Sequence, residues 1–470
     1  MDFNKDLIES FCLEIISNTT QIRNDKNKLL VHKYATKASL ILLESLCLAA
    51  EVCEESAKYL YKDINWSTDK IVANNFKILR QIKGFVEQLA FYLDYLEHSR
   101  VDNVPNGLAT PFARIAKHII LDVEIILYQQ WDYNYSIRIT DIQHGLAKVI
   151  VEPFKTYVQE SLYEKAIKNM SQPIYPVAFP YLEKNNIFQY SLLGHEIGHL
   201  YADRLLKDVD IHTSLNLLLK KHLNDEKIKD NIPEFIDYCA YIWKRLFEEL
   251  MSDAVGTVLF GPAMVFSISE FALHYDLDLL PSRENNFYPP WRSRLRLSIE
   301  VLKRNISDLE SMSNGSSLFG NAQIQDRIES IIDIIKKQSD LKAMKSDEIL
   351  SALFKNVYDH VVSKQEEIYK HFSKNNFNKD DFFKKIELLS DRLTRGIPPN
   401  TTNDLDSTKN ATLCEILNAA WKERISWESG IFDGDGSFKN ESLKKRTKLN
   451  DLTNKAIEFS ELQASYLEFK

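Results

Sequence analysis

The stretch LGHEIGHL, residues 193–200, carries an H-E-x-x-H pattern inside a segment that reads as a helix. His195 and His199 are four residues apart, so they lie one above the other on a helix face and can bind one metal ion. Glu196 points about 100° around the helix from His195. It is therefore poorly placed as a third ligand but well placed to reach a water on the metal. Because such a pattern arises by chance in roughly one chain of this size in fifty, the surrounding sequence has to decide its meaning.

Composition places the chain among ordinary globular proteins. Of its 470 residues, 44% are hydrophobic and 27% are charged, and the length allows two or three domains or one large elaborated domain. Only 13 Gly and 13 Pro occur, and so few breakers favour long helices. The formal net charge of −8 gives the chain as a whole no electrostatic reason to seek nucleic acid or an anionic membrane.

The cysteines and the N-terminus indicate the compartment. The five cysteines are scattered and contain no C-x-x-C, which argues against a disulfide framework and against a thiolate zinc site. Residues 1–6 lack the basic and apolar features of an export signal, and the most apolar early run, residues 40–50, is interrupted by Glu44. We therefore expect a cytoplasmic protein without a membrane span.

Three regions are expected along the chain. Residues 1–103 read as amphipathic helices, because apolar residues recur at helical spacing. Breakers cluster at residues 103–111 and again at 311–320. Between them we expect a core at residues 104–312, followed by a C-terminal helical region at 313–470. The helical flanks are expected to restrict access to the core or to recognise a substrate or partner protein.

Within the core, the pattern predicts a small β-sheet followed by two important helices. Residues 128–140, and especially 132–139, alternate apolar and polar side chains and are the best strand candidate. Residues 174–179 form a second candidate. Prolines stand within it and on both sides, which suits an edge strand. A helix at about 187–206 carries the H-E-x-x-H, and another runs over 233–260. The predicted fold class is therefore mainly α with a small β-sheet (α+β).

The third metal ligand must come from outside the first motif. A catalytic zinc takes three protein ligands and keeps a fourth position for water. Leu205 stands where the H-E-x-x-H-x-x-G-x-x-H arrangement has its third histidine. On the second helix, Glu249 and Asp253 share a face, so one carboxylate could bind the metal while the other holds a histidine ring. Glu248 and Asp203 remain rival ligands, and Asp203 could also replace Asp253.

At this point the sequence resembles a known group. H-E-x-x-H followed on a later helix by E-x-x-x-D is similar to the gluzincin superfamily of zinc metallopeptidases, to which thermolysin belongs. The resemblance covers roughly residues 125–300. It includes YPPWRSRL at 288–295, which is similar to the H-P-P-x-x-x-R-L stretch of several small gluzincins, with Tyr288 in place of the histidine. The roles implied by the resemblance are zinc ligands at His195, His199 and Glu249, a general base at Glu196, and a partner of a ligand histidine at Asp253.

The resemblance implies a zinc-dependent metallopeptidase that hydrolyses peptide bonds of a protein or peptide substrate, with Glu196 activating a zinc-bound water. The oxyanion needs a further donor. Candidates by position are Tyr288, Arg294, Tyr201 and His274. A structural role for Arg294, in which it only ties loop carbonyls, is the favoured alternative. Extended substrates of such enzymes pair with an edge strand beside the metal helix, which residues 133–139 could provide.

Two other functions compete with the peptidase. One is a metal-bound regulatory or sensor protein that has a single dedicated partner and little general peptidase activity. The intact Glu196 argues against an inactive enzyme. The other is a helical scaffold with a coincidental motif, which a metal assay would identify.

Overall fold

The computed structural model describes residues 5–62, 69–120, 123–220, 232–278, 288–305, 322–337, 339–341, 347–372, 382–401, 410–428 and 440–468. The chain divides into two compact units, Met1–Lys184 and Asn185–Lys470. Most of the described residues are helical and one small sheet is present, which confirms the predicted mainly α class with a little β. Among the described helices, none combines the length and apolar character needed to cross a bilayer. The division into the three predicted regions, 1–103, 104–312 and 313–470, stays a prediction.

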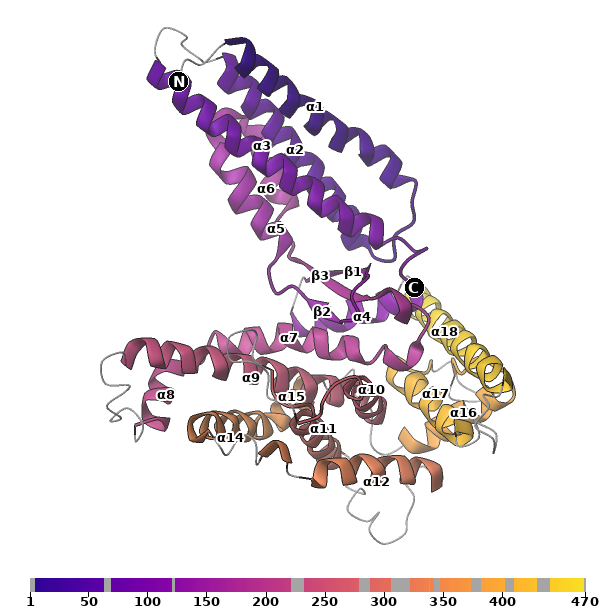
Figure 1. Ribbon diagram of the computed structural model, residues 1–470. Coiled ribbons are helices and arrows are strands. Elements are labelled where there is room, and N and C mark those ends of the chain that lie inside the picture. Colours follow the sequence, from indigo (N-terminus) through magenta and orange to yellow (C-terminus); the bar gives the residue numbers. More distant parts are fainter. Residues whose placement is uncertain are drawn as a thin grey trace. The chain divides into compact units, whose positions relative to one another are not determined.

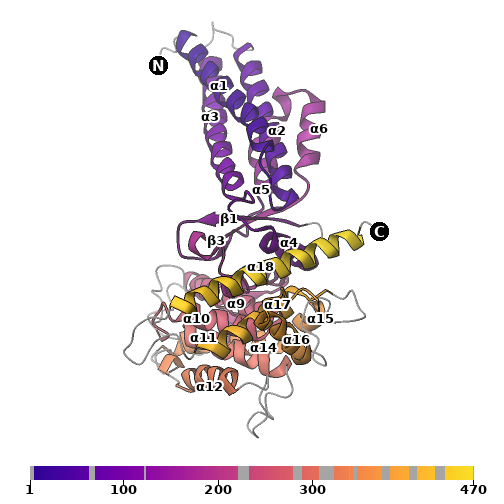
Figure 2. The same cartoon turned by 90° about the vertical axis from the view of Figure 1, so that its right-hand side faces the viewer.

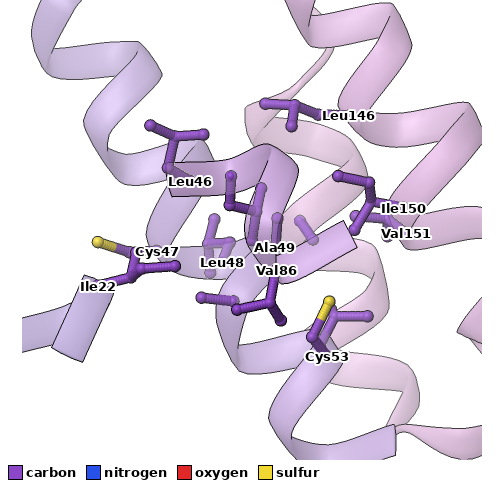
Figure 3. Packing of buried hydrophobic residues seen from close by; sticks show 14 of the residues in the cluster. Ile22, Leu46, Cys47, Leu48, Ala49, Cys53, Val86, Leu146, Ile150 and Val151 are labelled. Atoms are coloured by element: carbon purple, nitrogen blue, oxygen red, sulfur yellow. The ribbon is translucent and has the colours of Figure 1, made fainter. Parts of the chain in front are cut away.

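The first unit is built around a bundle of long helices. Its helices are α1 (Lys5–Leu30), α2 (Lys37–Lys62), α3 (Asp69–His98), α4 (Asn106–Ile119), α5 (Ile142–Gly145) and α6 (Glu160–Asn169). Helices α1, α2 and α3 lie side by side in both views (Figures 1 and 2). Leu46, Ala49 and Val86 are among the buried side chains that gather between them (Figure 3). The amphipathic pattern of this region therefore forms a conventional apolar core.

In the described residues of the first unit, the sheet has three strands, β1 (Glu124–Gln130), β2 (Ser136–Ile137) and β3 (Ile174–Pro180). Their order is β1-β3-β2, with β3 parallel to β1 and antiparallel to β2. The range predicted for β3 is confirmed, but its placement at an edge is wrong. Pro176 has no N–H to donate to a neighbouring strand. Its carbonyl accepts from the N–H of Arg138, so its backbone polar groups face β2, which pairs with β3 over only two residues. Few ladder bonds are therefore lost, and the proline is tolerated in this central strand.

The best strand candidate of the sequence is mostly wrong. Of the predicted range 128–140, only residues 128–130, the end of β1, and residues 136–137, which form β2, lie in strands, and β1 begins four residues before the predicted start. The alternation rule misses the first part of β1 because three consecutive apolar residues, Ile125, Ile126 and Leu127, are all buried. Such continuous runs are typical of strands covered on both faces. Substrate pairing along this segment stays a prediction.

The described residues of the second unit are mostly helical. Its helices are α7 (Leu192–Leu206), α8 (Ile211–Leu218), α9 (Ile232–Phe260), α10 (Pro262–Ala272), α11 (Trp291–Asn305), α12 (Ala322–Lys336), α14 (Glu348–Ser363), α15 (Gln365–His371), α16 (Phe382–Thr394), α17 (Leu413–Glu428) and α18 (Asn440–Glu468). The prediction of α9 is confirmed. Helix α7 begins later than expected, because Ile187–Gln189 forms a separate 3₁₀ turn. The predicted break at 311–320 lies outside the described residues.

The turn between α9 and α10 is fixed by a side chain from α17. Gly261 has a φ of 55°, in the left-handed region that favours glycine, and Pro262 starts the next helix. The buried Asn418 amide donates to the carbonyl of Phe260 at 2.8 Å and accepts from the N–H of Ala263 at 2.9 Å. One amide thus satisfies a donor and an acceptor of the turn and holds the end of α9.

Candidate metal centre

The two motif helices approach each other closely because glycines face the contact. Helix α7 packs along α9 (Figure 1). A Cβ atom added to Gly198 would lie 2.7 Å from the Cα and 3.0 Å from the carbonyl oxygen of Ser252. On α9, a Cβ at Gly256 would lie 3.2 Å from the backbone nitrogen of His195. These glycines therefore set a helix separation at which carboxylates on α9 reach the histidines of α7.

Gly198→Ala is expected to destabilise the protein by about 1–3 kcal/mol, because the new methyl meets backbone atoms of α9 that cannot turn aside. The forced separation should also weaken metal binding. Thermal unfolding and metal titration measure the two effects. Gly84→Ala is the matched control, because this glycine in α3 has open space around it and the change is expected to stabilise by about 0.5–1 kcal/mol. Equal stability of Gly198→Ala and wild type would contradict the close-approach argument.

Three buried side chains converge on one point. The Nε2 atoms of His195 and His199 are 3.1 Å apart. Glu249 from α9 places Oε2 3.4 Å from Nε2 of His195 and Oε1 3.8 Å from Nε2 of His199. Tetrahedral coordination with bonds of about 2.0–2.1 Å separates ligand atoms by about 3.3 Å. The donor atoms are thus spaced as one small cation requires, and the group can hold a metal ion.

Asp253 fixes the ring of the first histidine. Its Oδ1 is 2.8 Å from Nδ1 of His195, which leaves Nε2 facing the cluster. The rival carboxylates lie elsewhere: Asp203 pairs with Lys207 at 3.1 Å, and Glu248 bonds Arg245 at 2.6 Å. The structure therefore brings Glu249 and Asp253, the two carboxylates of the E-x-x-x-D spacing, to the histidines.

Arg294 is buried directly behind these groups. Its Nε donates to Oδ2 of Asp253 at 2.7 Å and its Nη2 donates to Oδ1 at 2.9 Å, so the contact is bidentate. Its Nη1 lies 3.3 Å from Oε2 of Glu249. The guanidinium also covers the ring of Trp291, with its carbon 4.2 Å from the ring centroid. All three nitrogens thus face protein carboxylates, so the geometry favours holding those carboxylates over donating to a substrate.

The other predicted residues divide between the site and its surroundings. Glu196 is buried, and its charge acts on Arg294 and on Tyr288. Tyr288 is 39% exposed, and burial and the Glu249 carboxylate raise its pKa. Tyr201, by contrast, packs its ring against His371 and Phe372. His274 contacts the ring of Phe271. Of the four candidate oxyanion donors, Tyr288 and Arg294 therefore lie beside the cluster.

Electrostatics of the metal-free cluster favour a divalent cation. Around it are four carboxylates, two guanidiniums and two imidazoles, so the formal charge is −1 while His195 is protonated and −2 once that proton has left. These charged groups are Glu196, Glu248, Glu249, Asp253, Arg245 and Arg294. Burial disfavours so much uncompensated charge. A bound divalent cation would neutralise it.

The two histidines titrate very differently in the metal-free cluster. Burial would lower the pKa of His195, but the Asp253 and Glu249 carboxylates outweigh burial and raise it to about 9. Burial lowers the pKa of His199 to about 3 in spite of Glu249. Burial would raise the pKa of Glu249, but His195, Arg294 and His199 lower it. One proton, on His195, therefore has to leave when a metal binds.

Metal affinity is expected to rise about tenfold per pH unit between about pH 4.5 and 5.5, because binding displaces the single proton of His195. The sign follows from the raised pKa: His195 is protonated throughout this window and His199 is neutral. Competition with a chelator of known pH dependence measures the slope. Two ordinary histidines would both be mostly protonated there and would give a slope close to two, which would contradict the assignment.

Arg245 is a site residue that the sequence reasoning missed. It precedes Glu249 by one helical turn on α9, and its Nη2 lies 3.3 Å from Oε1 of that carboxylate. Its guanidinium carbon lies 5.0 Å from the centroid of the Tyr288 ring. The i, i+4 spacing of Arg245 and Glu249 is a signal that could have identified it.

Comparison of the chain with protein-family models, with curated proteins and with solved structures finds no match for it. The reading of the site therefore rests on its residues and their geometry.

Proposed function

We propose that this chain is a zinc-dependent metallopeptidase of the gluzincin type that hydrolyses peptide bonds in a protein or peptide substrate. The observation that carries the proposal is the convergence of His195, His199 and Glu249, with donor atoms 3.1–3.8 Å apart. Glu196 follows the first of these ligands directly. Two histidines and a glutamate are a donor set found in catalytic zinc sites, where a fourth position stays open.

A bound zinc ion supplies Lewis-acid polarisation of the scissile carbonyl and makes water acidic enough to ionise near neutral pH. In the proposed reaction Glu196 accepts the proton of the attacking water and passes it to the leaving amine. Tyr288 is the favoured oxyanion donor, since it is partly exposed beside the cluster. Arg294 holds Asp253 and Glu249 in place, and Asp253 orients the His195 ring.

The proposed setting is the cytoplasm. None of the five buried cysteines forms a disulfide bond, as a reducing compartment allows. The helices outside the motif region offer surfaces for substrate selection or for a partner protein. No nucleic-acid partner is proposed, because the net charge of −8 disfavours it.

The test combines a metal assay with identification of substrates. Purified protein is expected to contain about one zinc ion per chain. New protein termini in cells that express the wild type are compared with those in cells that express Glu196→Gln. Termini that depend on Glu196 support the peptidase. If the protein binds zinc and one defined partner in a pull-down but produces no such termini, the regulatory or sensor protein is favoured instead. Absence of zinc and indifference to chelators would leave only a coincidental motif.

A further inference from the structure

We propose that Arg245 is a positioning residue that holds the ligand Glu249 and the Tyr288 ring at the same time. Its contact with Glu249, the first half of the proposal, affects metal binding alone. Its contact with Tyr288, the second half, affects turnover and rests on the peptidase proposed above.

The first half follows from the contacts of the Glu249 carboxylate. Arg245 Nη2 is 3.3 Å from Oε1, and Arg294 Nη1 is 3.3 Å from Oε2. The two arginines come from different helices, α9 and α11, so each oxygen is held by its own guanidinium. With both oxygens restrained, the carboxylate is turned toward the histidines before any metal arrives, and less rotational freedom is lost on binding.

The second half follows from the place of Tyr288. This residue lies in no helix or strand and precedes the Pro289-Pro290 pair, and its ring is partly exposed. Arg245 lies over that ring, at a cation–π distance of 5.0 Å. A tyrosine outside regular structure needs such a contact to keep its hydroxyl at a fixed place, so Arg245 links Tyr288 to the helix that carries Glu249.

Arg245 is itself anchored. Its Nη1 donates to Oε2 of Glu248 at 2.6 Å, and the side chain of Glu248 is only 13% exposed. A planar guanidinium can donate to Glu248 and Glu249 along its edge while its face covers an aromatic ring. The compact ammonium of a lysine can keep the charge beside Glu249 but cannot do all three at once. This difference separates the two halves experimentally.

The experiment compares Arg245→Met, Arg245→Lys and the control Lys244→Met in the full-length protein. Lys244 is the neighbouring exposed cation on α9, so its loss removes the same charge without touching Glu249. Zinc affinity is measured by chelator competition, and the visible absorption of the Co²⁺-substituted protein reports the ligand geometry. Turnover of a peptide found in the substrate search is measured in parallel, and circular dichroism confirms folding.

Arg245→Met is expected to weaken zinc binding about 10–100-fold and to change the Co²⁺ spectrum, whereas Lys244→Met changes neither. Arg245→Lys should keep most of the zinc affinity but lower kcat about as much as Tyr288→Phe does, and combining the two changes should add little further loss. Unchanged zinc affinity and spectrum in Arg245→Met overturn the first half. Wild-type kcat in Arg245→Lys, or fully additive losses with Tyr288→Phe, overturns the second. Because the metal measurements need no substrate, failure of the peptidase proposal remains distinguishable.

Discussion

Glu196→Gln is expected to lower the turnover of peptide hydrolysis by about 10²–10⁴-fold, because the amide cannot accept the proton of the attacking water. The change is almost isosteric, and Glu196 is absent from the group of side chains that can hold the metal. Zinc content should therefore remain near one ion per chain. The measurements are steady-state kinetics on an identified substrate and metal analysis of the same preparation.

Asp203→Asn is the matched control for this change. Asp203 lies on the same helix α7, but its carboxylate is partly exposed and pairs with Lys207 rather than with the cluster. Its replacement should leave kcat unchanged. Turnover by Glu196→Gln at the wild-type rate would exclude Glu196 as the base and would remove the main chemical support for a hydrolase.

Glu249→Gln is expected to weaken metal binding by more than about 100-fold. Loss of a residue that only hydrogen-bonds a metal ligand typically weakens binding about 10–100-fold, whereas this change removes the charge of a proposed ligand itself. The metal-free protein should also lose stability. Arg294 and Arg245 both face this carboxylate, and breaking a buried ion pair on one side typically costs about 3–5 kcal/mol. Zinc titration and chemical unfolding in the presence of a chelator measure the two effects separately.

Glu248→Gln provides the comparison within the same helical turn. Glu248 bonds Arg245 and faces no histidine, so its replacement should leave zinc stoichiometry intact. Glu249→Asp addresses the risk that the amide variant fails to fold, because it keeps the charge while shortening the reach to the histidines. Normal zinc affinity in Glu249→Gln together with its loss in Glu248→Gln would reverse the ligand assignment.

The part of the site that could be predicted consists of side chains whose spacing follows from helix geometry. His195 and His199 share a face of α7, and Glu249 and Asp253 share a face of α9, since residues four apart lie one above the other. Choosing Glu249 over Glu248 depended on the E-x-x-x-D resemblance. The structure brings the named residues together, and their roles as ligands stay predictions.

What could not be predicted depends on contacts between elements distant in the chain. Arg294 meets Asp253 across 41 residues, and no periodicity in either segment marks the pair. The first part of strand β1, residues 124–127, was missed because an apolar run buried on both faces lacks alternation. The position of Tyr288 next to Arg245 likewise requires the path of the chain between α10 and α11, which local pattern does not specify.

The link from Asn418 to the end of α9 also orders events during biosynthesis. Phe260, which accepts its hydrogen bond, is synthesised 158 residues earlier. At typical translation rates of about 5–20 residues per second, the interval is about 8–30 s. A nascent or truncated chain thus carries all the proposed metal ligands before the amide that secures their second helix exists. A chain that has not yet reached residue 418 therefore lacks this support at the end of the helix that carries Glu249.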